Sequence, residues 1–526
     1  MRAGCLVICG IALVQAGSLA VQPAAAGPAG QQPADVPVVV AAAATVGTDD
    51  DRNKKKPSET PKPAPKPESA AHPEMKHSKS RLSNKPVPLL KEHTQLPERN
   101  PPIYEWNLPF LGPGNIISGF KSPTGAVWQP AFWVFGTLQS SAGVFNDGVN
   151  PGRQYVSGRA DIFGNLQLTP TERVLIGFTP LSQGPNLGTG LLHVDGQGSQ
   201  FVDAFNPNIQ TLFFEGDTRQ LFPGIDANDR KGLDYGFSVG KQPIFFQEGI
   251  MINDNIQALG ITKDSIQIPG ITQDLRVTGV WGWGDIRRGD VVPVPDKSAQ
   301  LLGVFTEMDT RKSIFTFDVA FVASDNPRDL AGVQRGGSGF YWGASATQRF
   351  GDINTAFRIN TSTALDAKGT SIDDGALLLA EISRTMPGSN NIIYANIFGV
   401  VGNYTSAARS SQVAGPLERV GILFSPLAAG LAGSPIPSDA NHAYGGAIGY
   451  QMFFGPRRQL TLELGGKEFT RGAESVPGRR QGVVALGGQY VQGITSRTSV
   501  QFNAFVLDAQ VGHFGYGAAV GTTTRW

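Results

Sequence analysis

The sequence predicts an all-β fold, a closed antiparallel transmembrane β-barrel of about 16–18 strands that follows a disordered N-terminal extension. Three observations predict it. From about residue 130 onward, segments of roughly ten residues alternate apolar and polar side chains and are separated by Gly, Pro, Asn and Asp. Charged residues stand in the middle of the polar faces, which suits a water-filled lumen better than a packed core. No stretch reaches the roughly 20 apolar residues that a membrane helix needs.

Residues 1–26 have the parts of a secretory signal peptide. Arg2 supplies the positive charge, Cys5–Val14 is the apolar run, and Ala24–Ala26 is a small-residue cleavage site, with a second small-residue site a few residues upstream. Both cysteines of the chain lie in this segment, so we expect a mature protein without thiols or disulfides. A lipid anchor on Cys9 is disfavoured by the bulky residue before it.

Residues 27–102 are expected to form a disordered, Pro/Lys-rich periplasmic segment. Lys54–Lys56 is followed by alternating Pro and Lys up to Pro67, and no aromatic residue occurs before Tyr104. Each Pro fixes φ and the lysine charges repel, so the chain extends, and nothing in it can nucleate a core. The segment is either a plain spacer or a basic tether for the peptidoglycan or another periplasmic partner. The barrel then occupies residues 103–526.

The alternating segments of this barrel predict about 18 strands, an even number within the range of single-chain outer-membrane barrels. They lie near 131–144, 154–168, 171–180, 208–216, 233–243, 271–284, 299–308, 312–323, 338–350, 352–364, 376–385, 391–403, 418–425, 443–454, 458–468, 481–492, 496–508 and 515–526. Short connections, expected to be periplasmic turns, fall at 169–170, 309–311, 351, 455–457 and 493–495. Long and short connections do not alternate throughout, so at least one strand between 180 and 300, or between 403 and 442, is misassigned.

The polar faces of these strands carry the side chains that we expect to line the pore. In 155–168, for example, Ile162 and Leu166 fall on one face, and Arg159 and Asp161 fall on the other. The charged candidates for selectivity are Arg159, Asp161, Asp274, Arg276, Asp318, Arg349, Arg358, Glu463 and Lys467. Their mixed signs, among many Ser, Thr, Asn and Gln, suit neutral, hydroxyl-rich solutes such as sugars, or modest anions. The alternative is that each charge merely solvates the lumen and pairs across strands.

A long loop at 244–270 is the expected constriction. Its beginning carries Phe245, Phe246, Ile250 and Ile252, which would be unusual in a loop that is freely exposed to water. If the loop folds inward, the side chains expected at the narrowest point are Glu248, Asp254 and Asn255.

The stretch 233–260 resembles alginate-export-type and related substrate-specific outer-membrane channels. The matching pattern is a strand that ends in Gly-Lys-Gln, followed by Gly and then by Asn-Asp before a short apolar group. In this sequence the matching residues are Gly240, Lys241, Gln242, Gly249, Asn253 and Asp254. The resemblance implies a passive channel in which long loops and charged lumen residues select the solute. Lys241 departs from the more usual Arg, and its position in the alternation puts it on the apolar face.

The last strand ends at Trp526, and a terminal aromatic residue on an alternating strand resembles the signal that the outer-membrane assembly machinery recognises. The usual residue there is Phe. This signal and the signal peptide predict export to the outer membrane of a Gram-negative cell, with membrane lipid as the surrounding partner.

The sequence predicts no enzyme, no cofactor and no metal site. The six histidines are scattered, and no metalloprotease, hydrolase, phosphate-loop or paired-cysteine motif occurs. Acidic residues around Asp226 have turn chemistry and lack the spacing of a calcium loop. The net charge of +1 predicts no nucleic-acid partner. We therefore expect a porin-like channel for small hydrophilic solutes or saccharides. The alternative is a structural or secretion-associated barrel that binds a periplasmic partner through its N-terminal segment.

Overall fold

A computed structural model describes most of the chain from residue 99 onward. The described ranges are 99–111, 118–148, 152–181, 190–193, 200–201, 205–227, 230–288, 295–325, 337–366, 372–410, 413–427, 433–470, 482–509 and 513–526. The predicted signal peptide and most of the predicted Pro/Lys-rich segment, residues 1–98, lie outside these ranges.

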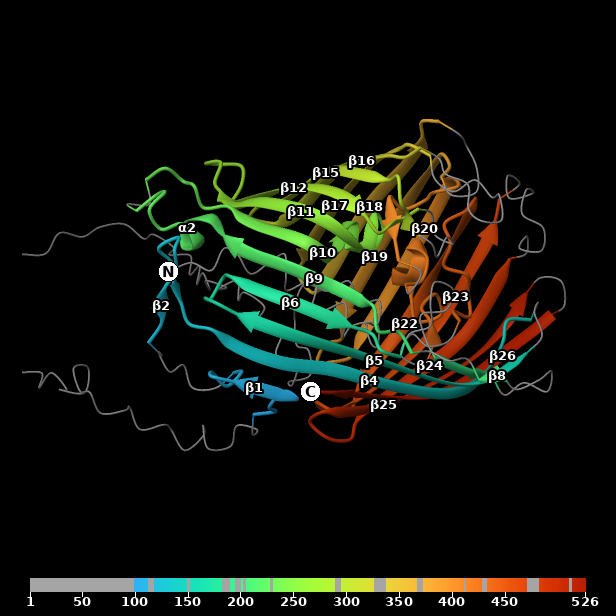
Figure 1. Cartoon of the computed structure of the whole chain (residues 1–526). Coiled ribbons are helices and arrows are strands. Elements are labelled where there is room, and N and C mark those ends of the chain that lie inside the picture. The colour runs from blue at the N-terminus through green and yellow to red at the C-terminus, as the bar shows by residue number, and fades with distance from the viewer. Residues whose placement is uncertain are drawn as a thin grey trace, which may run out of the picture. The chain divides into compact units, whose positions relative to one another are not determined.

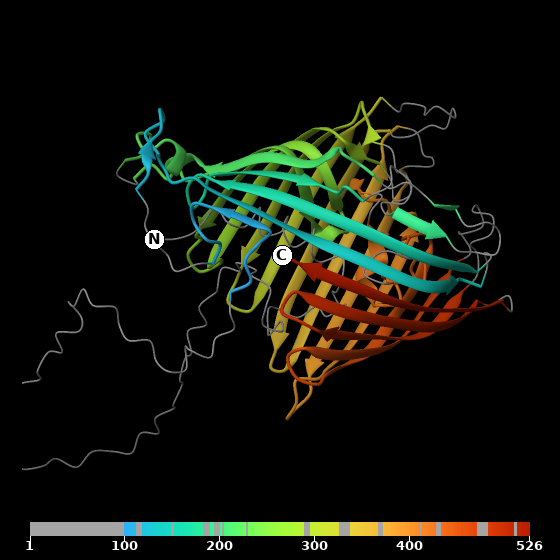
Figure 2. The same cartoon turned by 60° about the horizontal axis from the view of Figure 1, so that its bottom comes forward.

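Within the described residues, 18 strands form one closed antiparallel barrel, which confirms the predicted fold class (Figures 1 and 2). The barrel strands are β4 (Ala131–Asn146), β5 (Arg153–Gln167), β6 (Arg173–Phe178), β9 (Ile209–Asp217), β10 (Gly236–Phe246), β11 (Ile252–Ile266), β12 (Asp274–Gly284), β15 (Gln300–Asp309), β16 (Ser313–Ala323), β17 (Gly339–Phe350), β18 (Ile353–Ala364), β19 (Gly375–Thr385), β20 (Ile392–Gly402), β22 (Ala443–Phe453), β23 (Arg458–Phe469), β24 (Val483–Gly493), β25 (Thr498–Ala509) and β26 (His513–Arg525). Strand β26 pairs with β4 from Tyr516↔Asn146 to Arg525↔Thr137. This pairing closes the sheet and removes its edges, as a bilayer requires.

The connections alternate between the two ends of the barrel. One end, here called the short-turn end, has the connections 168–172, 218–235, 267–273, 310–312, 351–352, 386–391, 454–457 and 494–497. The small helix α2 (Thr218–Leu221) lies in the second of these, and all five short connections predicted from the sequence fall at this end. The remaining connections form the long-loop end. Because the number of strands is even, β4 begins and β26 ends at the short-turn end.

The wall has an apolar outer face and a polar inner face. Along β25, Phe502 and Val506 are 50% and 42% exposed, whereas the intervening side chains of Gln501 and Asn503 are buried inside the barrel. The period of two in strand geometry sends neighbouring side chains to opposite faces, so one segment serves lipid outside and a polar lumen inside.

Two sequence assignments are wrong, and they offset each other in the strand number. The segment 418–425, predicted as a strand, lies in the 3-10 helix η4 (Pro416–Val420) and in the turn that follows it. The segment 244–270, predicted as a loop, contains the end of β10, a turn and the whole of β11. The number of strands therefore stays at 18, inside the predicted range.

The N-terminal strap, defined here as residues 100–106, is attached to the seam between β26 and β4. It contains the short strand β1 (Tyr104–Trp106), which pairs with β4 from Tyr104↔Val134 to Trp106↔Phe132. This pairing continues the line of β26, whose end is fixed to β4 because the backbones of Trp526 and Gly136 exchange two hydrogen bonds. The remaining short strands are β2 (Phe120–Lys121), β3 (Val127–Trp128), β7 (Gly190–His193), β8 (Gln200–Phe201), β13 (Ile286–Arg287), β14 (Pro295–Asp296) and β21 (Ala408–Arg409).

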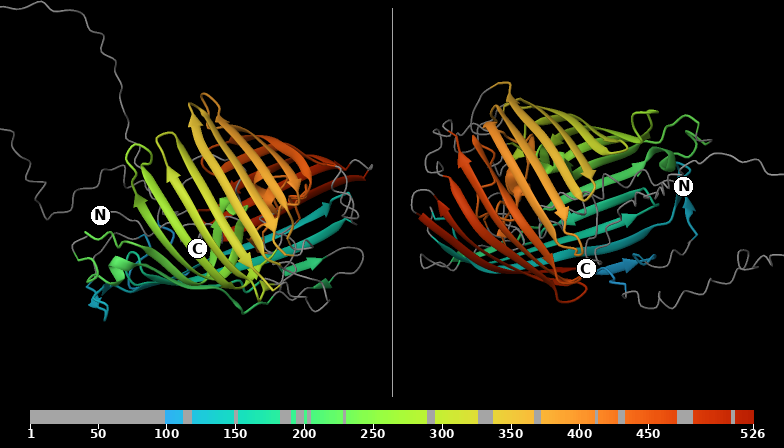
Figure 3. Two further views of the ribbon diagram at one scale, coloured as in Figure 1. Left: turned by 90° about the horizontal axis from the view of Figure 1, so that it is seen from above. Right: turned by 180° about the vertical axis from the view of Figure 1, so that it is seen from behind.

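Two stretches leave the wall and enter the long-loop half of the lumen, where Figure 3 shows turns and short helices inside the ring of strands. The first is the hairpin tip, residues 244–256, which joins β10 to β11 through the 3-10 helix η3 (Gln247–Gly249). The second is the lumen segment, residues 404–442, which is described at 404–410, 413–427 and 433–442.

Candidate functional site

The hairpin tip lies against the inner wall because its turn has an unusual backbone. Gln247, Glu248 and Gly249 have φ values of 52°, 55° and 80°, in the left-handed region. This bend carries the Gln247 side chain to β16, where its Nε2 donates to Thr316 Oγ1 at 2.8 Å and to Asp318 Oδ2 at 2.9 Å. Gly343 on β17 makes room, because a Cβ there would lie 2.9 Å from the Gln247 side chain.

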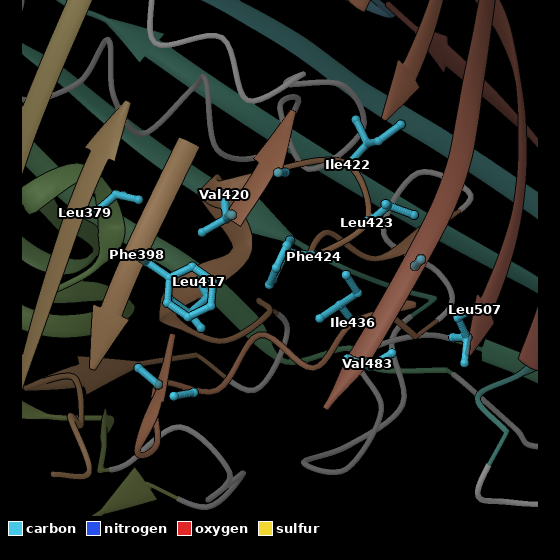
Figure 4. Close-up of a cluster of buried hydrophobic side chains, with 14 of the residues drawn as sticks. Leu379, Phe398, Leu417, Val420, Ile422, Leu423, Phe424, Ile436, Val483 and Leu507 are labelled. Atoms are coloured by element: carbon cyan, nitrogen blue, oxygen red, sulfur yellow. The ribbon is translucent and has the colours of Figure 1, made fainter. Parts of the chain in front are cut away.

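The lumen segment returns to the wall at the point where it leaves. His442 N donates to Gly402 O at 2.8 Å, and Tyr404 N donates to Ala440 O at 2.9 Å. Between these points the segment packs an apolar core inside the barrel (Figure 4). The core joins side chains of the segment to inner-face side chains of the wall, and includes Leu417, Val420, Ile422, Leu423, Phe424 and Ile436 with Leu379, Phe398, Val483, Phe505 and Leu507.

Polar inner-face side chains of the wall hold this core in register. Glu463 on β23 accepts from the backbone N–H groups of Ile422 at 3.0 Å and Leu423 at 2.9 Å, and also from the hydroxyl of Tyr394. Lys467, four residues further along β23 on the same face, donates to Pro437 O at 3.1 Å and Asp439 O at 2.7 Å. Backbone groups in the interior that would otherwise lack partners are thereby satisfied.

The hairpin tip and the lumen segment are joined to each other. The carbonyl of Ile250 accepts from Tyr404 Oη at 3.1 Å, from Ser406 Oγ at 2.8 Å and from the guanidinium of Arg409. Strand β11 pairs in parallel with β21 at Ile252↔Ala408. The two inward stretches therefore form one connected body inside the barrel, here called the lumen body.

One ion pair on the lumen body remains in contact with solvent. Glu248 and Arg419 lie 3.1 Å apart, and their side chains are 44% and 23% exposed. The positive charge of Arg419, helped by that of Arg358, holds the pKa of Glu248 below its ordinary value even though burial acts in the opposite direction. Glu418 directly precedes Arg419 on the chain, and burial raises the pKa of its carboxyl group. The lumen body thus presents both signs of charge at one place.

All nine predicted pore-lining residues lie on the inner face, and the structure distributes them among three surroundings. Asp318, Glu463 and Lys467 hold the lumen body. Arg159–Asp161 at 2.9 Å, Arg276–Glu307 at 3.1 Å and Arg358–Glu381 at 2.9 Å are ion pairs within the wall. Arg349 bonds to Gly351 O in a short turn at 2.8 Å, and Asp274 is the first residue of β12, so both lie at the short-turn rim.

The predicted constriction residues have three different environments. Glu248 is the exposed member of the ion pair on the lumen body. Asp254 is buried, and it accepts from Arg287 N at 2.9 Å and pairs with Arg287 Nη1 at 2.8 Å, which fixes β13 to the hairpin tip. Asn255 alternates with the buried residues of β11 and therefore lies on the other face of that strand. Lys241, from the resemblance motif, lies on the outer side of β10 and pairs with Asp285 at 3.3 Å.

Sequence reasoning missed the residues of the second inward stretch, Tyr404, Arg409 and Arg419. A signal for part of this stretch was present, because 420–424, directly after Arg419, is an apolar run without alternation in a chain whose strands alternate. Such a run suits a segment that is buried on all sides, and here that burial is inside the barrel.

The residues that the structure describes contain neither a metal-binding cluster nor a membrane-spanning helix. In the part of the chain that the structure describes, no cluster of three His, Cys, Asp or Glu side chains could hold a metal ion. Among the same residues, no helix is long and apolar enough to cross a membrane.

A closed barrel with an apolar outer face and a polar lumen defines a transmembrane β-barrel protein. The sequence matches no family model and no curated protein. Solved structures with similar folds include a BenF-like porin from Pseudomonas fluorescens Pf-5, with 10% identity, a TM-score of 0.49 and coverage of 75% of this chain and 98% of that one. Pseudomonas aeruginosa OccK2 in complex with glucuronate has 10% identity and a TM-score of 0.44, and covers 75% and 97%. Escherichia coli Wzi, described as a carbohydrate-binding β-barrel, has 9% identity and a TM-score of 0.43, and covers 74% and 83%.

Proposed function

We propose that this protein is an outer-membrane channel of a Gram-negative cell that lets small hydrophilic solutes diffuse passively. The supporting observation is the inner face of the barrel, where carboxylates and guanidinium groups stand in pairs such as Arg159–Asp161 and the more exposed Arg276–Glu307 among amides and hydroxyls. Paired charges leave little net field, so the lumen favours neutral solutes over either ion. Saccharides and other hydroxyl-rich molecules are the solute class that fits this lining.

The narrowest part of this channel is the level of the lumen body. The hairpin tip and the lumen segment reduce the open section of the barrel, and the Glu248–Arg419 pair borders what remains. A solute that passes this level meets a carboxylate and a guanidinium together, which between them can accept and donate hydrogen bonds.

Planar-bilayer recordings test the proposal. Purified protein in a salt gradient should give stepwise conductance with a reversal potential near zero, because the lumen charges are paired. Arg276→Ala frees the exposed Glu307, so the reversal potential should move toward cation preference. Arg311→Ala, in an exposed short turn, is the matched control and should leave it unchanged.

Two results would contradict this proposal separately. If the folded barrel does not conduct, it is not a channel. If it conducts and Arg276→Ala leaves the reversal potential unchanged, the paired lumen charges do not set selectivity.

The alternative function, a structural or secretion-associated barrel, is favoured by one observation, the apolar core inside the lumen. An apolar core inside the lumen is compatible with a barrel that is closed to solutes as well as with a barrel that is only narrowed. Absence of conductance, together with capture of peptidoglycan by the full-length chain through residues 27–102, would support this alternative.

A further inference from the structure

A groove of about 520 Å³ lies on the outer side of the barrel at the short-turn end, outside the proposed solute path. Its floor is formed where β4 and β5 present small outward-facing residues, Gly136 and Ala160, while larger apolar neighbours stand around them. Leu138 is 43% exposed and Ile162 is 38% exposed along its sides. The hollow therefore follows from side-chain size on an otherwise apolar wall.

The N-terminal strap forms the opposite side of this groove. Pro101, Pro102 and Ile103 line it, and the strap is fixed because Arg497 Nη2 donates to Pro101 O at 2.9 Å and Ser496 Oγ lies 2.8 Å from Asn100 Oδ1. The groove is thus enclosed between the wall and a second piece of chain, which distinguishes it from the open outer face of the barrel.

The groove lies at the level where a membrane surface is expected. Exposed aromatic residues mark the short-turn end of the barrel: Tyr104, Trp106, Phe350, Phe454 and Trp526. Aromatic side chains at strand ends form the girdles that face lipid headgroups in transmembrane barrels. Trp526 itself lines the groove, so the groove lies at the depth of these aromatic residues.

Arg497 supplies a positive charge at the rim. Its guanidinium has one hydrogen bond to a described residue, the carbonyl of Pro101, and no ion pair with a described residue. A guanidinium is always charged and presents a planar set of donors that suits a phosphate. An apolar hollow with such a group at its rim is complementary to one molecule with an apolar tail and an anionic head.

From this arrangement we propose that the groove binds one glycerophospholipid of the adjacent membrane leaflet, with its phosphate on Arg497 and an acyl chain between Leu138, Ile162 and the strap. The lipid would join the strap, the turn 494–497 and the β26–β4 seam through contacts that protein alone does not make. The bound lipid is then a structural ligand of the seam and not a transported solute.

Native mass spectrometry of the delipidated, detergent-solubilised protein tests this site with palmitoyl-oleoyl-phosphatidylethanolamine as the probe. One lipid should remain bound at a concentration where further lipids do not. Arg497→Ala removes the phosphate contact and Ala160→Leu fills the floor, and each should lower occupancy about tenfold, as expected for loss of a charged hydrogen bond or of the acyl-chain space.

Matched controls change the same residue types elsewhere on the barrel. Arg311→Ala in another short turn and Ala380→Leu on the outer face of β19 should retain the lipid. Equal occupancy in all four variants would overturn the proposal. Displacement of the lipid by millimolar inorganic phosphate alone would also overturn it, because the site would then recognise phosphate and not lipid. If Arg497→Ala does not fold, Ala160→Leu alone decides between these outcomes.

Discussion

At the scale of single residues, inner-face charges serve two different purposes that the sequence cannot separate. Glu463 and Arg276 both stand on polar faces of alternating strands, and both were predicted to line the pore. The structure places Glu463 under the lumen segment and Arg276 beside an exposed carboxylate. The surroundings of each residue depend on which distant segment of the chain covers it. The alternation of apolar and polar residues contains no information about that covering segment.

Glu463→Gln should loosen the lumen segment without opening the wall. The carboxylate accepts three hydrogen bonds, whereas an amide has only one acceptor oxygen and turns donors toward the N–H groups of Ile422 or Leu423. The expected loss is roughly 2–4 kcal/mol of docking free energy. Limited proteolysis should then cut within 413–436 faster than in the wild type.

The control for this variant is Asp508→Asn, which changes an exposed carboxylate on the outer side of β25. It should be cut at the wild-type rate. Equal proteolysis of the Glu463→Gln protein and the wild type would mean that the carboxylate does not hold the segment.

At the scale of elements, every barrel strand except β11 was predictable, and the reason for the exception is physical. The tip half of β11 has apolar residues on its inner side, Ile252 and Ile256, and polar Asn253 and Asn255 on its other side. That half has left the lipid-facing wall and packs inside the barrel. Its apolar residues are therefore buried against the inner wall, whereas the apolar residues of a membrane strand face lipid. The run 418–425 was misassigned for the same reason, since its apolar residues face the lumen core.

Shortening the lumen segment should widen the channel. Replacing residues 413–436 with a short Gly/Ser link removes most of the apolar core but keeps the pairing of Ile252 with Ala408. Single-channel conductance should rise severalfold, because the obstruction of the long-loop half is removed, while the heat-modifiable gel shift of the barrel persists. Gly/Ser replacement within the short turn 386–391 is the control. Unchanged conductance in the shortened protein would mean that the segment does not limit flow.

At the scale of the whole molecule, the barrel closes through two pieces of chain from opposite ends of the described sequence. Strand β26 covers most of β4, and β1 covers its first residues. The alternation predicted β26, but a strand as short as β1 has no readable period. The seam is therefore the part of the wall that sequence reasoning described least completely.

Two truncations measure what the strap contributes to this seam. The quantity measured is the temperature to which the sample must be heated before the band of the folded barrel disappears from the gel. A chain that begins at Asn100 keeps the strap, so this temperature should equal that of the mature protein. A chain that begins at Asn107 loses the β1 pairing and the Arg497 contact, so its transition should fall by a few degrees. Equal transitions for the two chains would show that the strap adds no stability.

The return of the lumen segment to its own starting point has a consequence for the order in which the barrel assembles. Strands β20 and β22 can pair only after a stretch of about 40 residues has closed on itself, whereas β22 and β23 are joined by a turn of four residues. The entropy of closing a loop grows with the logarithm of its length, and three doublings amount to about 2 kcal/mol. We therefore expect β22–β26 to pair early as one block and the pairing of β22 with β20 to form late. The apolar core of the lumen segment would then stabilise a contact that the backbone alone forms slowly.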